Sequence, residues 1–264
     1  MSRTVLVTGA TDGLGRAVAA DLVHAGHTVL VHGRDPQRLH ATVDETGAAR
    51  AYRADFASLQ EVRDLADTLL RGEERLDVLV NNAGIGSTLP GDGQRLESQD
   101  GHELRFAVNY LAPFALTERL LPLLERSGPA RIVNVSSLGQ APIDFDDVML
   151  ERRYDGTRAY AQSKLAQVMH TFDLAERLDP GQVTANALHP ATYMPTKIVI
   201  HARGSGVSRL EDGSEATERL AVDADVDGVS GRFYDGLRES AANPQAYDAE
   251  ARRRLRDLSL RLTM

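Results

Sequence analysis

Short apolar runs alternate with longer amphipathic stretches along the chain. The apolar runs lack the polar alternation of half-exposed strands, which indicates strands covered by helices on both faces. The predicted strands are Val5–Thr8, Thr28–His32, Ala49–Ala54, Leu76–Asn81, Arg131–Ser136, Val183–His189 and Gly231–Tyr234. The predicted helices are Gly13–Ala25, Pro36–Glu45, Leu59–Leu70, Gly101–Glu125, Arg158–Leu178, Thr217–Ala224 and Pro244–Leu260. This alternation predicts an α/β fold, a doubly wound parallel sheet of about seven strands.

The chain contains no linker, repeat or low-complexity tract that would divide it, so residues 1–264 are expected to form a single domain. Two segments, Gly86–Asp100 and His201–Gly213, are rich in glycine, serine and charged residues. Loops at the carboxyl ends of the strands border the ligand crevice of such a sheet. The second segment therefore predicts a substrate lid near residues 193–225, with an ordinary surface loop as the alternative.

Charge and composition narrow the classes of function. The chain has 30 Lys and Arg against 38 Asp and Glu, a formal net charge of -8, which argues against nucleic-acid binding because that requires a basic surface. It contains no cysteine, and its 8 histidines show no metal-ligand spacing, so no metal site is expected. The segment Met1–Thr8 leaves no room for a signal peptide, and no apolar stretch reaches the ~20 residues of a membrane span. We expect a cytoplasmic protein without a membrane anchor.

A glycine-rich turn, Thr8-Gly9-Ala10-Thr11-Asp12-Gly13-Leu14-Gly15, joins the first predicted strand to the first helix. Glycines allow a tight turn and a close approach of the backbone to a pyrophosphate, and the helix N-terminus offers free N–H groups to phosphate. The turn predicts a Rossmann-type dinucleotide-binding fold. Its expected cofactor contacts are Gly9, Thr11, Asp12, Gly13, Leu14 and Gly15. A glycine-rich loop that binds no ligand is the alternative.

The end of the second strand bears on the choice of cofactor. Folds that bind NAD commonly place a carboxylate here to hold the ribose 2′-hydroxyl, whereas an arginine accommodates the 2′-phosphate of NADP. This chain has Gly33 and Arg34 at that point, and Asp35 is better suited to cap the helix that begins at Pro36. The pattern favours NADP(H), with NAD(H) as the second choice, unless Arg34 is only a solvated loop cation.

Tyr160 and Lys164 lie four residues apart on a predicted helix and therefore share one face. A phenol with a pKa of about 10 is a poor base at neutral pH. A neighbouring ammonium group favours the phenolate and lowers that pKa, which would make the tyrosine a usable acid or base. The alternative is an ordinary Tyr/Lys pair on a solvated helix face.

Several motifs follow one another in a characteristic order. They are the glycine turn, Asp55 after the third strand, Asn81-Asn82-Ala83-Gly84, Asn109, Ser136-Ser137, and Tyr160-Ala161-Gln162-Ser163-Lys164. With these motifs the chain resembles the short-chain dehydrogenase/reductase family over essentially its full length. The segment from Ile143 to Tyr154 and the tail around Gly231–Tyr234 resemble the retinol-dehydrogenase-like branch of that family.

The resemblance implies a catalytic role for four residues. Tyr160 would donate a proton to a carbonyl oxygen in reduction and accept one from an alcohol in oxidation, and Lys164 would also hold the nicotinamide ribose. Ser137 would hydrogen-bond the reacting oxygen, with Ser136 as its structural neighbour. Asn109 would position a water that relays protons to Lys164, although a locally hydrogen-bonded helix asparagine is the alternative.

The resemblance also implies cofactor contacts beyond the glycine turn and Arg34. They are Asp55, Phe56, Asn82, Ala83, Gly84, Tyr160, Lys164, Pro190, Thr192 and Tyr193. Asp55 would contact the adenine amino group, unless it caps the next helix, a role for which Ser58 is a good candidate. After the sixth strand the family's usual Pro-Gly reads Pro190-Ala191, and either Thr192 or Thr196 would meet the nicotinamide carboxamide.

Together these features predict an NADP(H)-dependent oxidoreductase that interconverts a small carbonyl compound and an alcohol. A non-catalytic NADP(H)-binding regulator and a sugar-nucleotide epimerase or dehydratase are the alternatives. Retinoid-like lipids, steroids, polyketides and simple ketones all stay open as substrates. A homo-oligomer could form through Gly101–Glu125 and Arg158–Leu178, as in many relatives. The apolar stripe Leu165, Val168, Met169 and Phe172 is the candidate contact, unless it packs inside the chain.

Overall fold

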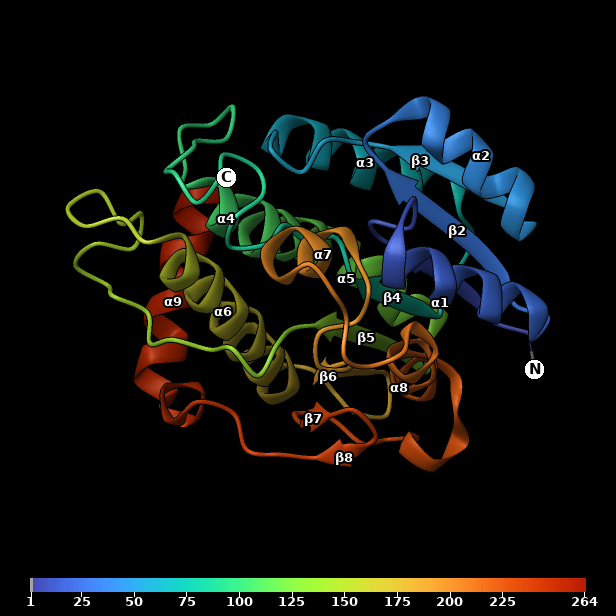
Figure 1. Ribbon diagram of the computed structural model, residues 1–264. Helices are drawn as coiled ribbons and strands as arrows, with labels where there is room; N and C mark the ends of the chain where they lie inside the picture. The colour runs from blue at the N-terminus through green and yellow to red at the C-terminus, as the bar shows by residue number, and fades with distance from the viewer. Residues whose placement is uncertain (1) are drawn as a thin grey trace.

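The strands form one eight-stranded sheet in the order β3-β2-β1-β4-β5-β6-β7-β8, in a computed structural model that describes residues 2–264 (Figure 1). The strands are β1 (Thr4–Val7), β2 (Thr28–Gly33), β3 (Arg50–Arg53), β4 (Val78–Asn81), β5 (Ala130–Val135), β6 (Val183–His189), β7 (Phe233–Asp235) and β8 (Arg238–Glu239). All neighbouring strands from β3 to β7 are parallel, and β8 alone runs antiparallel to β7. The predicted single-domain, Rossmann-type α/β fold is therefore confirmed.

Helices cover both faces of this sheet. They are α1 (Gly13–His24), α2 (Pro36–Thr46), α3 (Leu59–Gly72), α4 (Leu104–Phe106), α5 (Ala112–Ser127), α6 (Gly156–Arg177), α7 (Lys197–Arg203), α8 (Leu210–Val222) and α9 (Ala249–Thr263). A π-helical turn, Ala107–Leu111, joins α4 to α5. Two 3₁₀ turns, Ala224–Val226 and Pro244–Tyr247, complete the regular structure that is described.

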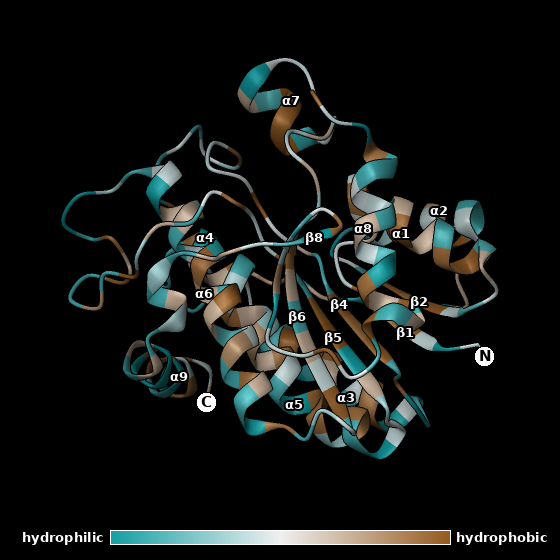
Figure 2. Ribbon diagram, turned by 90° about the horizontal axis from the view of Figure 1, so that it is seen from below, coloured by the Kyte–Doolittle hydropathy of each residue, from teal (hydrophilic) through white to brown (hydrophobic). Residues whose placement is uncertain are grey.

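The strands bury alternate residues in two separate cores. In β1, Leu6 belongs to the core that includes residues of α3, α5, α6 and α9, whereas Val5 and Val7 belong to the core on the opposite face, with residues of α1, α2 and α8. In Figure 2 brown, that is, hydrophobic, residues occur along the central strands of the sheet. Because both faces of β1 are buried, the run Val5-Leu6-Val7 is apolar without interruption, as expected for a parallel sheet.

The chain reverses direction across the sheet between β1 and β4. From β1 the chain builds outward through β2 to β3, and then crosses back to place β4 on the other side of β1. Ligands of open α/β sheets bind beyond the carboxyl ends of the strands at such a switch point. The glycine turn after β1 and the Asn82–Gly84 segment after β4 both lie at this edge.

Three predicted elements were wrong in extent. The predicted helix Gly101–Glu125 begins only at Leu104 and contains the π-helical turn, and the predicted helix Pro244–Leu260 is a 3₁₀ turn followed by α9. The predicted helix Thr217–Ala224 begins seven residues earlier, at Leu210, where Asp212 caps its start by accepting from Arg209 N at 3.1 Å. Strand β8 was missed, since two exposed charged residues carry no apolar pattern.

The segment predicted as a lid divides into two unlike parts. Helix α8 packs against α1 and buries Ala216 and Leu220 in the core. Helix α7 buries none of its residues and stands apart from the helices that cover the sheet (Figure 2). Only the part before α8 has the exposure expected of a lid, and α8 belongs to the body of the domain.

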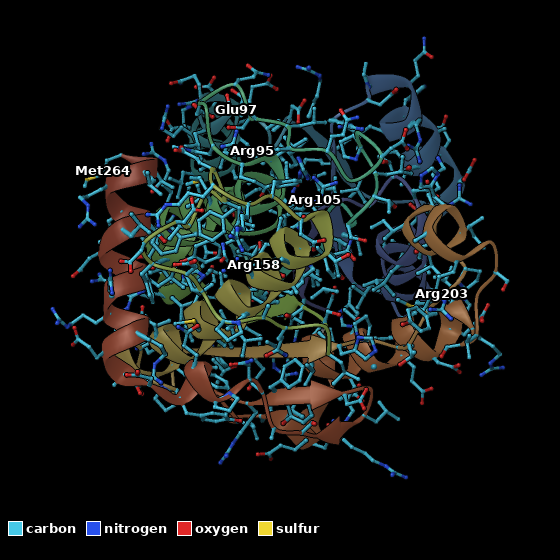
Figure 3. All side chains as sticks on the ribbon, turned by 60° about the vertical axis from the view of Figure 1, so that its left-hand side comes forward. Arg95, Glu97, Arg105, Arg158, Arg203 and Met264 are labelled. Atoms are coloured by element: carbon cyan, nitrogen blue, oxygen red, sulfur yellow. The ribbon has the colours of Figure 1, made fainter. Side chains whose placement is uncertain are left out.

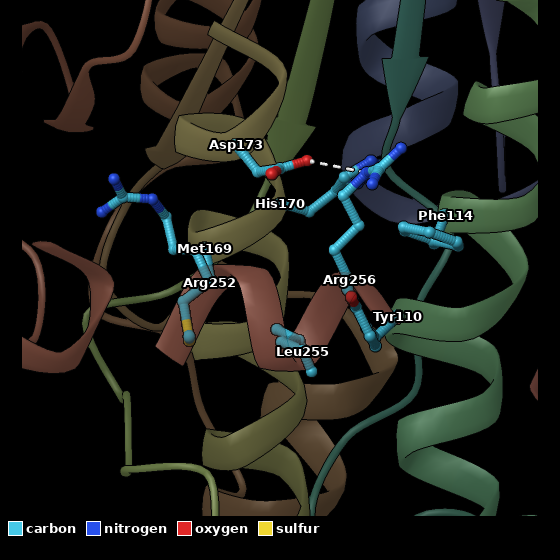
Figure 4. Close-up of a pocket in the computed structure, with 8 residues that line it drawn as sticks. All are labelled: Tyr110, Phe114, Met169, His170, Asp173, Arg252, Leu255 and Arg256. Carbon is cyan, nitrogen blue, oxygen red and sulfur yellow. Dashed lines mark ion pairs between the residues drawn. The ribbon is translucent and has the colours of Figure 1, made fainter. Parts of the chain in front are cut away.

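Helix α9 covers the outer side of α5 and α6. Leu255 lies among apolar side chains of both helices, and Tyr110 shares a 2.7 Å hydrogen bond with Ser259 of α9. Figure 4 shows this junction, including the ion pair between Asp173 and Arg256, 3.6 Å apart. The residues that line it are Tyr110, Phe114, Met169, His170, Asp173, Arg252, Leu255 and Arg256.

The apolar stripe on α6 is buried inside the chain itself. Leu165, Val168 and Met169 are fully buried and Phe172 nearly so. The alternative to an oligomer contact is thus confirmed for these four residues. Homo-oligomer formation itself stays a prediction, and its contact would need a different surface.

No helix among residues 2–264 combines the length and the hydropathy needed to cross a bilayer.

Replacing Leu255 with alanine tests whether α9 is an integral part of the fold. The side chain is 1% exposed, so Leu255→Ala should lower the free energy of unfolding in urea by about 3 kcal/mol. Arg253→Ala, on the solvent side of the same helix with its side chain 66% exposed, should change it little. Equal stability of both variants and the wild type would show that α9 is dispensable.

Candidate active site

The glycine turn packs directly onto the segment that follows β4. A Cβ atom on Gly15 would lie 2.3 Å from Asn82 Nδ2, and a Cβ on Gly9 would lie 2.7 Å from Ala83 Cα. Asn82 Nδ2 donates to the carbonyl oxygens of Thr8, at 2.8 Å, and Gly9, at 3.2 Å. Only glycine fits at these two positions, and the Asn82 side chain holds the turn in place.

The N-terminus of α1 begins in this turn. Asp12 caps it by accepting from Gly13 N at 2.8 Å. The same carboxylate pairs with Arg38 Nη2 at 2.8 Å and with Lys197 Nζ of α7 at 2.7 Å. The side chain of Leu14, which was predicted to contact the cofactor, is 6% exposed and belongs to the core between α1 and α8. The backbone of the turn is therefore open to a ligand, and two cations, Arg38 and Lys197, lie beside it.

A buried histidine supports the turn from below. His32 Nδ1 accepts from Gly9 N at 3.3 Å, and His32 Nε2 lies 3.1 Å from the carbonyl oxygen of Ala54. This pairing requires the neutral ring with its proton on Nε2. Burial lowers the pKa of His32 to about 4, despite the opposing effects of Ala54 and Asp55. His32 therefore ties the ends of β1, β2 and β3 together, a role that the sequence alone did not indicate.

The end of β2 carries two exposed charged residues, Arg34 and Asp35. Arg34 is exposed, and its guanidinium has no ion-pair partner among residues 2–264. Asp35 accepts from Gln37 N at 2.9 Å and from Arg38 N at 3.0 Å, so its predicted role as the cap of α2 is confirmed. Arg38, which the sequence did not single out, donates to the carbonyl oxygen of Thr11 at 3.0 Å and lies between α2 and the turn.

The segment after β3 contains two predicted cofactor contacts, the half-buried Asp55 and the buried Phe56. Asp55 accepts from Ala57 N at 2.9 Å, while Ser58 caps α3 by accepting from Glu61 N. The rival role of Asp55 as cap of α3 is thereby removed. Phe56, predicted in the cofactor site, is 4% exposed, and its ring stacks on His32 with centroids 4.4 Å apart. Its side chain serves the core.

The predicted catalytic residues meet where β5 and α6 approach each other. The Ser137 hydroxyl is close enough to the Tyr160 phenol to hydrogen-bond it, and both residues are half-buried. Lys164 Nζ lies 5.8 Å from the centre of the Tyr160 ring. Ser136 is instead buried and donates to the carbonyl oxygen of Lys164 at 2.7 Å. The structure thus separates the two serines as the resemblance implied.

The protonation states differ from those expected for the pair. Burial raises the pKa of Tyr160, and the Ser137 hydroxyl opposes this only in part. Burial lowers the pKa of Lys164 to about 7. The spacing of the two residues predicts a lowered phenol pKa, but in the chain by itself the pKa of Tyr160 is raised. The Tyr160 phenol therefore keeps its proton near neutral pH, and Lys164 is the group that titrates there.

Asn109 lies within the π-helical turn between α4 and α5. Its side chain accepts from Ile85 N at 2.8 Å and donates to the carbonyl oxygen of Ile85 at 3.1 Å and to Ser163 Oγ at 2.9 Å. Gly84 lies between Asn109 and Lys164, because a Cβ there would be 3.3 Å from Asn109 Oδ1 and 3.6 Å from Lys164 Nζ. Irregular helical turns of this kind are frequent at functional sites.

The loop after β6 separates the two candidate threonines. Thr192 lies beside its own strand, 3.1 Å from His189 Nε2. Thr196 begins α7 and lies against the glycine turn, where its Cγ2 would be 3.1 Å from a Cβ on Gly13. Tyr193 is 43% exposed with a φ of 52° and stacks on Arg203. Thr196 is therefore the threonine next to the turn, whereas Pro190 is buried at the strand end.

Arg105 is a residue of this region that the sequence did not reveal. It is 0% exposed and donates to the carbonyl oxygens of Gly86 and Ser87 and to the Tyr154 hydroxyl, at 2.9, 2.8 and 2.6 Å. Figure 3 labels Arg105 in the same region of the molecule as Arg95 and Glu97. A single arginine within an amphipathic stretch resembles a surface residue, so nothing in the pattern could have identified it. It fixes the loop after Asn82–Gly84 to the segment before Tyr160.

No group of three metal-ligating side chains occurs within residues 2–264.

The comparisons with known proteins agree with this geometry. The profile of the family described as short chain dehydrogenase matches residues 3–203. The chain therefore belongs to the short-chain dehydrogenase family, and it is an oxidoreductase of that family.

Individual relatives place it more closely. Retinol dehydrogenase 13 of Mus musculus is 38% identical over 284 residues, covering 98% of this chain and 83% of the relative. A crystal structure of an uncharacterized protein from Mycobacterium paratuberculosis has a TM-score of 0.79 at 30% identity, covering 99% of this chain and 93% of that one. A short-chain dehydrogenase of Shigella flexneri, solved with NADP, has a TM-score of 0.71 at 27% identity over 89% of this chain and 96% of that chain. The resemblance to the retinol-dehydrogenase-like branch is confirmed.

The buried histidine under the turn gives the fold a pH dependence. The pKa of His32 is about 4 in the folded chain and 6.5 ordinarily, so the unfolded chain binds the proton first as the pH falls. The contribution of His32 to stability is complete above pH 6.5 and decreases toward pH 4, by about 3 kcal/mol. His32→Gln cannot titrate, so urea unfolding should show the difference between wild type and variant shrinking over this range. A difference that does not change with pH would contradict a neutral, buried His32.

Proposed function

We propose that this oxidoreductase uses NADP(H) to interconvert a carbonyl compound and an alcohol, with Tyr160 as the general acid or base. The observation that carries the proposal is the meeting of Ser137 and Tyr160 beside Lys164, at the edge of the sheet where the glycine turn also lies. Ser137 follows β5, whereas Tyr160 and Lys164 lie on α6, the next element along the chain. A regulator that only binds the cofactor has no need of this arrangement.

The protonation states suit the reductive direction. Tyr160 carries its proton at neutral pH because burial raises the pKa of the phenol, so it can give that proton to a carbonyl oxygen. The Ser137 hydroxyl can hydrogen-bond the same oxygen and stabilise the charge that develops on it. The positive charge of Lys164 favours the phenolate that results. A bound nicotinamide would supply the hydride in reduction and accept it in oxidation.

The residues at the switch point fit a dinucleotide. The crowded positions of Gly9 and Gly15 leave the backbone of the turn bare, and the N-terminus of α1 points its N–H groups to the same place. Arg34 is suited to bind a 2′-phosphate, because its side chain is exposed and has no carboxylate partner within residues 2–264. Asp55, Gly84 and Thr196 lie along the same edge and are proposed as further contacts.

An apolar substrate is favoured by the surroundings of the site. Leu138, next to Ser137, is 46% exposed, and Tyr193, Ile198 and Ile200 in and before α7 are 36–43% exposed. We take residues 193–209 as the substrate lid, whose exposed apolar side chains would contact the substrate. The names of the similar retinol dehydrogenases make a retinoid-like alcohol or aldehyde the first candidate, ahead of steroids, polyketides and simple ketones.

The first experiment concerns the cofactor. Arg34→Ala should weaken NADPH binding about tenfold to 100-fold, because a charge-assisted contact with the 2′-phosphate is lost, and should leave NADH binding nearly unchanged. Fluorescence titration with both cofactors measures this. Arg71→Ala, at the far end of α3, removes the same charge and serves as the control. Equal losses for both cofactors in the Arg34 variant would sink the assignment.

The second experiment concerns the proton. Tyr160→Phe keeps the ring and removes the hydroxyl, so turnover of a carbonyl panel that includes retinal should fall by ~10²-fold or more while NADPH binding survives. Ser137→Ala should lower turnover without weakening NADPH binding. Tyr247→Phe, at a tyrosine 54% exposed on the far side of α6, is the matched control. A wild-type rate in Tyr160→Phe would refute the mechanism, and a wild-type protein without carbonyl turnover would favour the regulator or the epimerase.

A further inference from the structure

Helix α6 carries a buried polar residue that the proposed mechanism does not use, Gln167. Its side chain is 2% exposed, and it lies three residues after Lys164 on the same face of the helix. Gln167 Oε1 accepts a hydrogen bond of 2.9 Å from Lys164 Nζ. Among residues 2–264 the ammonium has one other acceptor, the carbonyl oxygen of Val135 at the end of β5, also at 2.9 Å.

The orientation of the Gln167 amide is imposed by the lysine. An ammonium group has donors only, so the amide must present its oxygen to Lys164. Its nitrogen, Nε2, is buried and has no hydrogen-bond partner in the described chain. An unpaired buried amide destabilises a fold, and an apolar side chain of similar volume would avoid this loss. Packing alone therefore does not account for a glutamine here, whereas contact with Lys164 does.

The two acceptors also determine where the lysine points. An ammonium has three N–H groups. Val135 and Gln167 take two of them from two different elements, β5 and α6. The third is left for the side where Tyr160 and Gly84 lie. A lysine held by one acceptor could turn about that single bond.

No carboxylate forms an ion pair with Lys164 among residues 2–264. The titratable groups that face it are Tyr160 on α6 and His189 at the end of β6. The pKa of Tyr160 is raised by burial, and the pKa of His189 is lowered by burial and by Lys164 against the opposing effect of Asp235. Both groups are thus uncharged near neutral pH. Neutral oxygen atoms are what stabilise the Lys164 charge.

We propose that Gln167 is a positioning residue whose amide oxygen keeps the Lys164 ammonium charged and directed toward Tyr160. Its consequence for turnover rests on the proposed function, but its effect on the lysine is a property of the chain alone. Burial already lowers the pKa of Lys164 to about 7. The loss of one acceptor would leave the lysine largely neutral under conditions where the tyrosine needs a cation beside it.

The composition of the chain allows a direct measurement. The sequence contains two lysines, Lys164 and Lys197. Protein labelled with ¹³C at the lysine ε-carbon gives one resonance from each, and Lys197→Arg assigns them. Lys197 is 71% exposed and serves as the internal reference. A pH titration of the Lys164 resonance then reports its protonation without any turnover.

Two substitutions should move the Lys164 midpoint in opposite directions. Gln167→Met keeps the bulk and removes the acceptor, so the midpoint should fall by about one pH unit. Gln167→Glu places a carboxylate at the same point, so the midpoint should rise by about one pH unit or more. A residue that only fills space would not produce shifts of opposite sign.

Gln162 supplies the matched control. It is also a buried glutamine on α6, 0% exposed, but it contacts Asp144 N and the carbonyl oxygen of Val148 rather than Lys164. Gln162→Met should leave the midpoint where it is in the wild type. If the Met variant at position 167 does not fold, Gln167→Asn replaces it, because the shorter amide cannot reach the ammonium and the midpoint should again fall.

The outcomes separate this inference from the proposed function. A Lys164 midpoint in Gln167→Met or Gln167→Asn that coincides with the wild type would overturn the role of Gln167, whatever the enzyme turns over. If the midpoint shifts as expected, the alkaline limb of the kcat profile should shift in the same direction while NADPH binding at lower pH is retained. Shifted midpoints in a protein without carbonyl turnover would refute the proposed function and leave the positioning of Lys164 intact.

Discussion

The close contact between the glycine turn and the segment after β4 is the constraint on which the rest of the site depends. A Cβ on Gly9 or Gly15 would collide with Ala83 or Asn82. The Asn82 side-chain amide donates hydrogen bonds to the carbonyl oxygens of the turn. The two segments meet because β1 and β4 are neighbours in the sheet. This contact sets the direction of α1, and the α1 N-terminus in turn defines where a phosphate can lie.

Two buried basic residues near this edge, Arg105 and Lys164, have different roles: one is structural and the other can titrate. Arg105 is held by carbonyl oxygens, by the Tyr154 hydroxyl and by the buried carboxylate of Glu103 at 3.6 Å, so it acts as a fixed brace between two loops. Lys164 is equally buried but has only two neutral acceptors, and its pKa falls to about 7. A group that titrates near neutrality, as Lys164 does, can respond to a cofactor or a substrate.

The rim of the site is held more weakly than its base. Helix α7 is attached by the exposed pairs Lys197–Asp12 and His201–Asp92, at 2.7 and 3.6 Å, and such pairs contribute little to stability. The base rests on buried contacts such as His32 with Gly9. This contrast suits a site in which the cofactor cradle is preformed and the substrate side can open.

The sequence by itself determined the features that depend on local pattern. The individual strands and helices, the glycine turn, the cap formed by Asp35 and the helical pairing of Tyr160 with Lys164 follow from periodicity and spacing, because each involves residues within a few positions of one another. Only the tertiary structure decided which side chains face the site. Leu14 and Phe56 turned into the core, and Lys164 found the carbonyl oxygen of Val135 on β5 as an acceptor, because these outcomes depend on how different elements pack together. The contact of Lys164 with Gln167, by contrast, is made within α6.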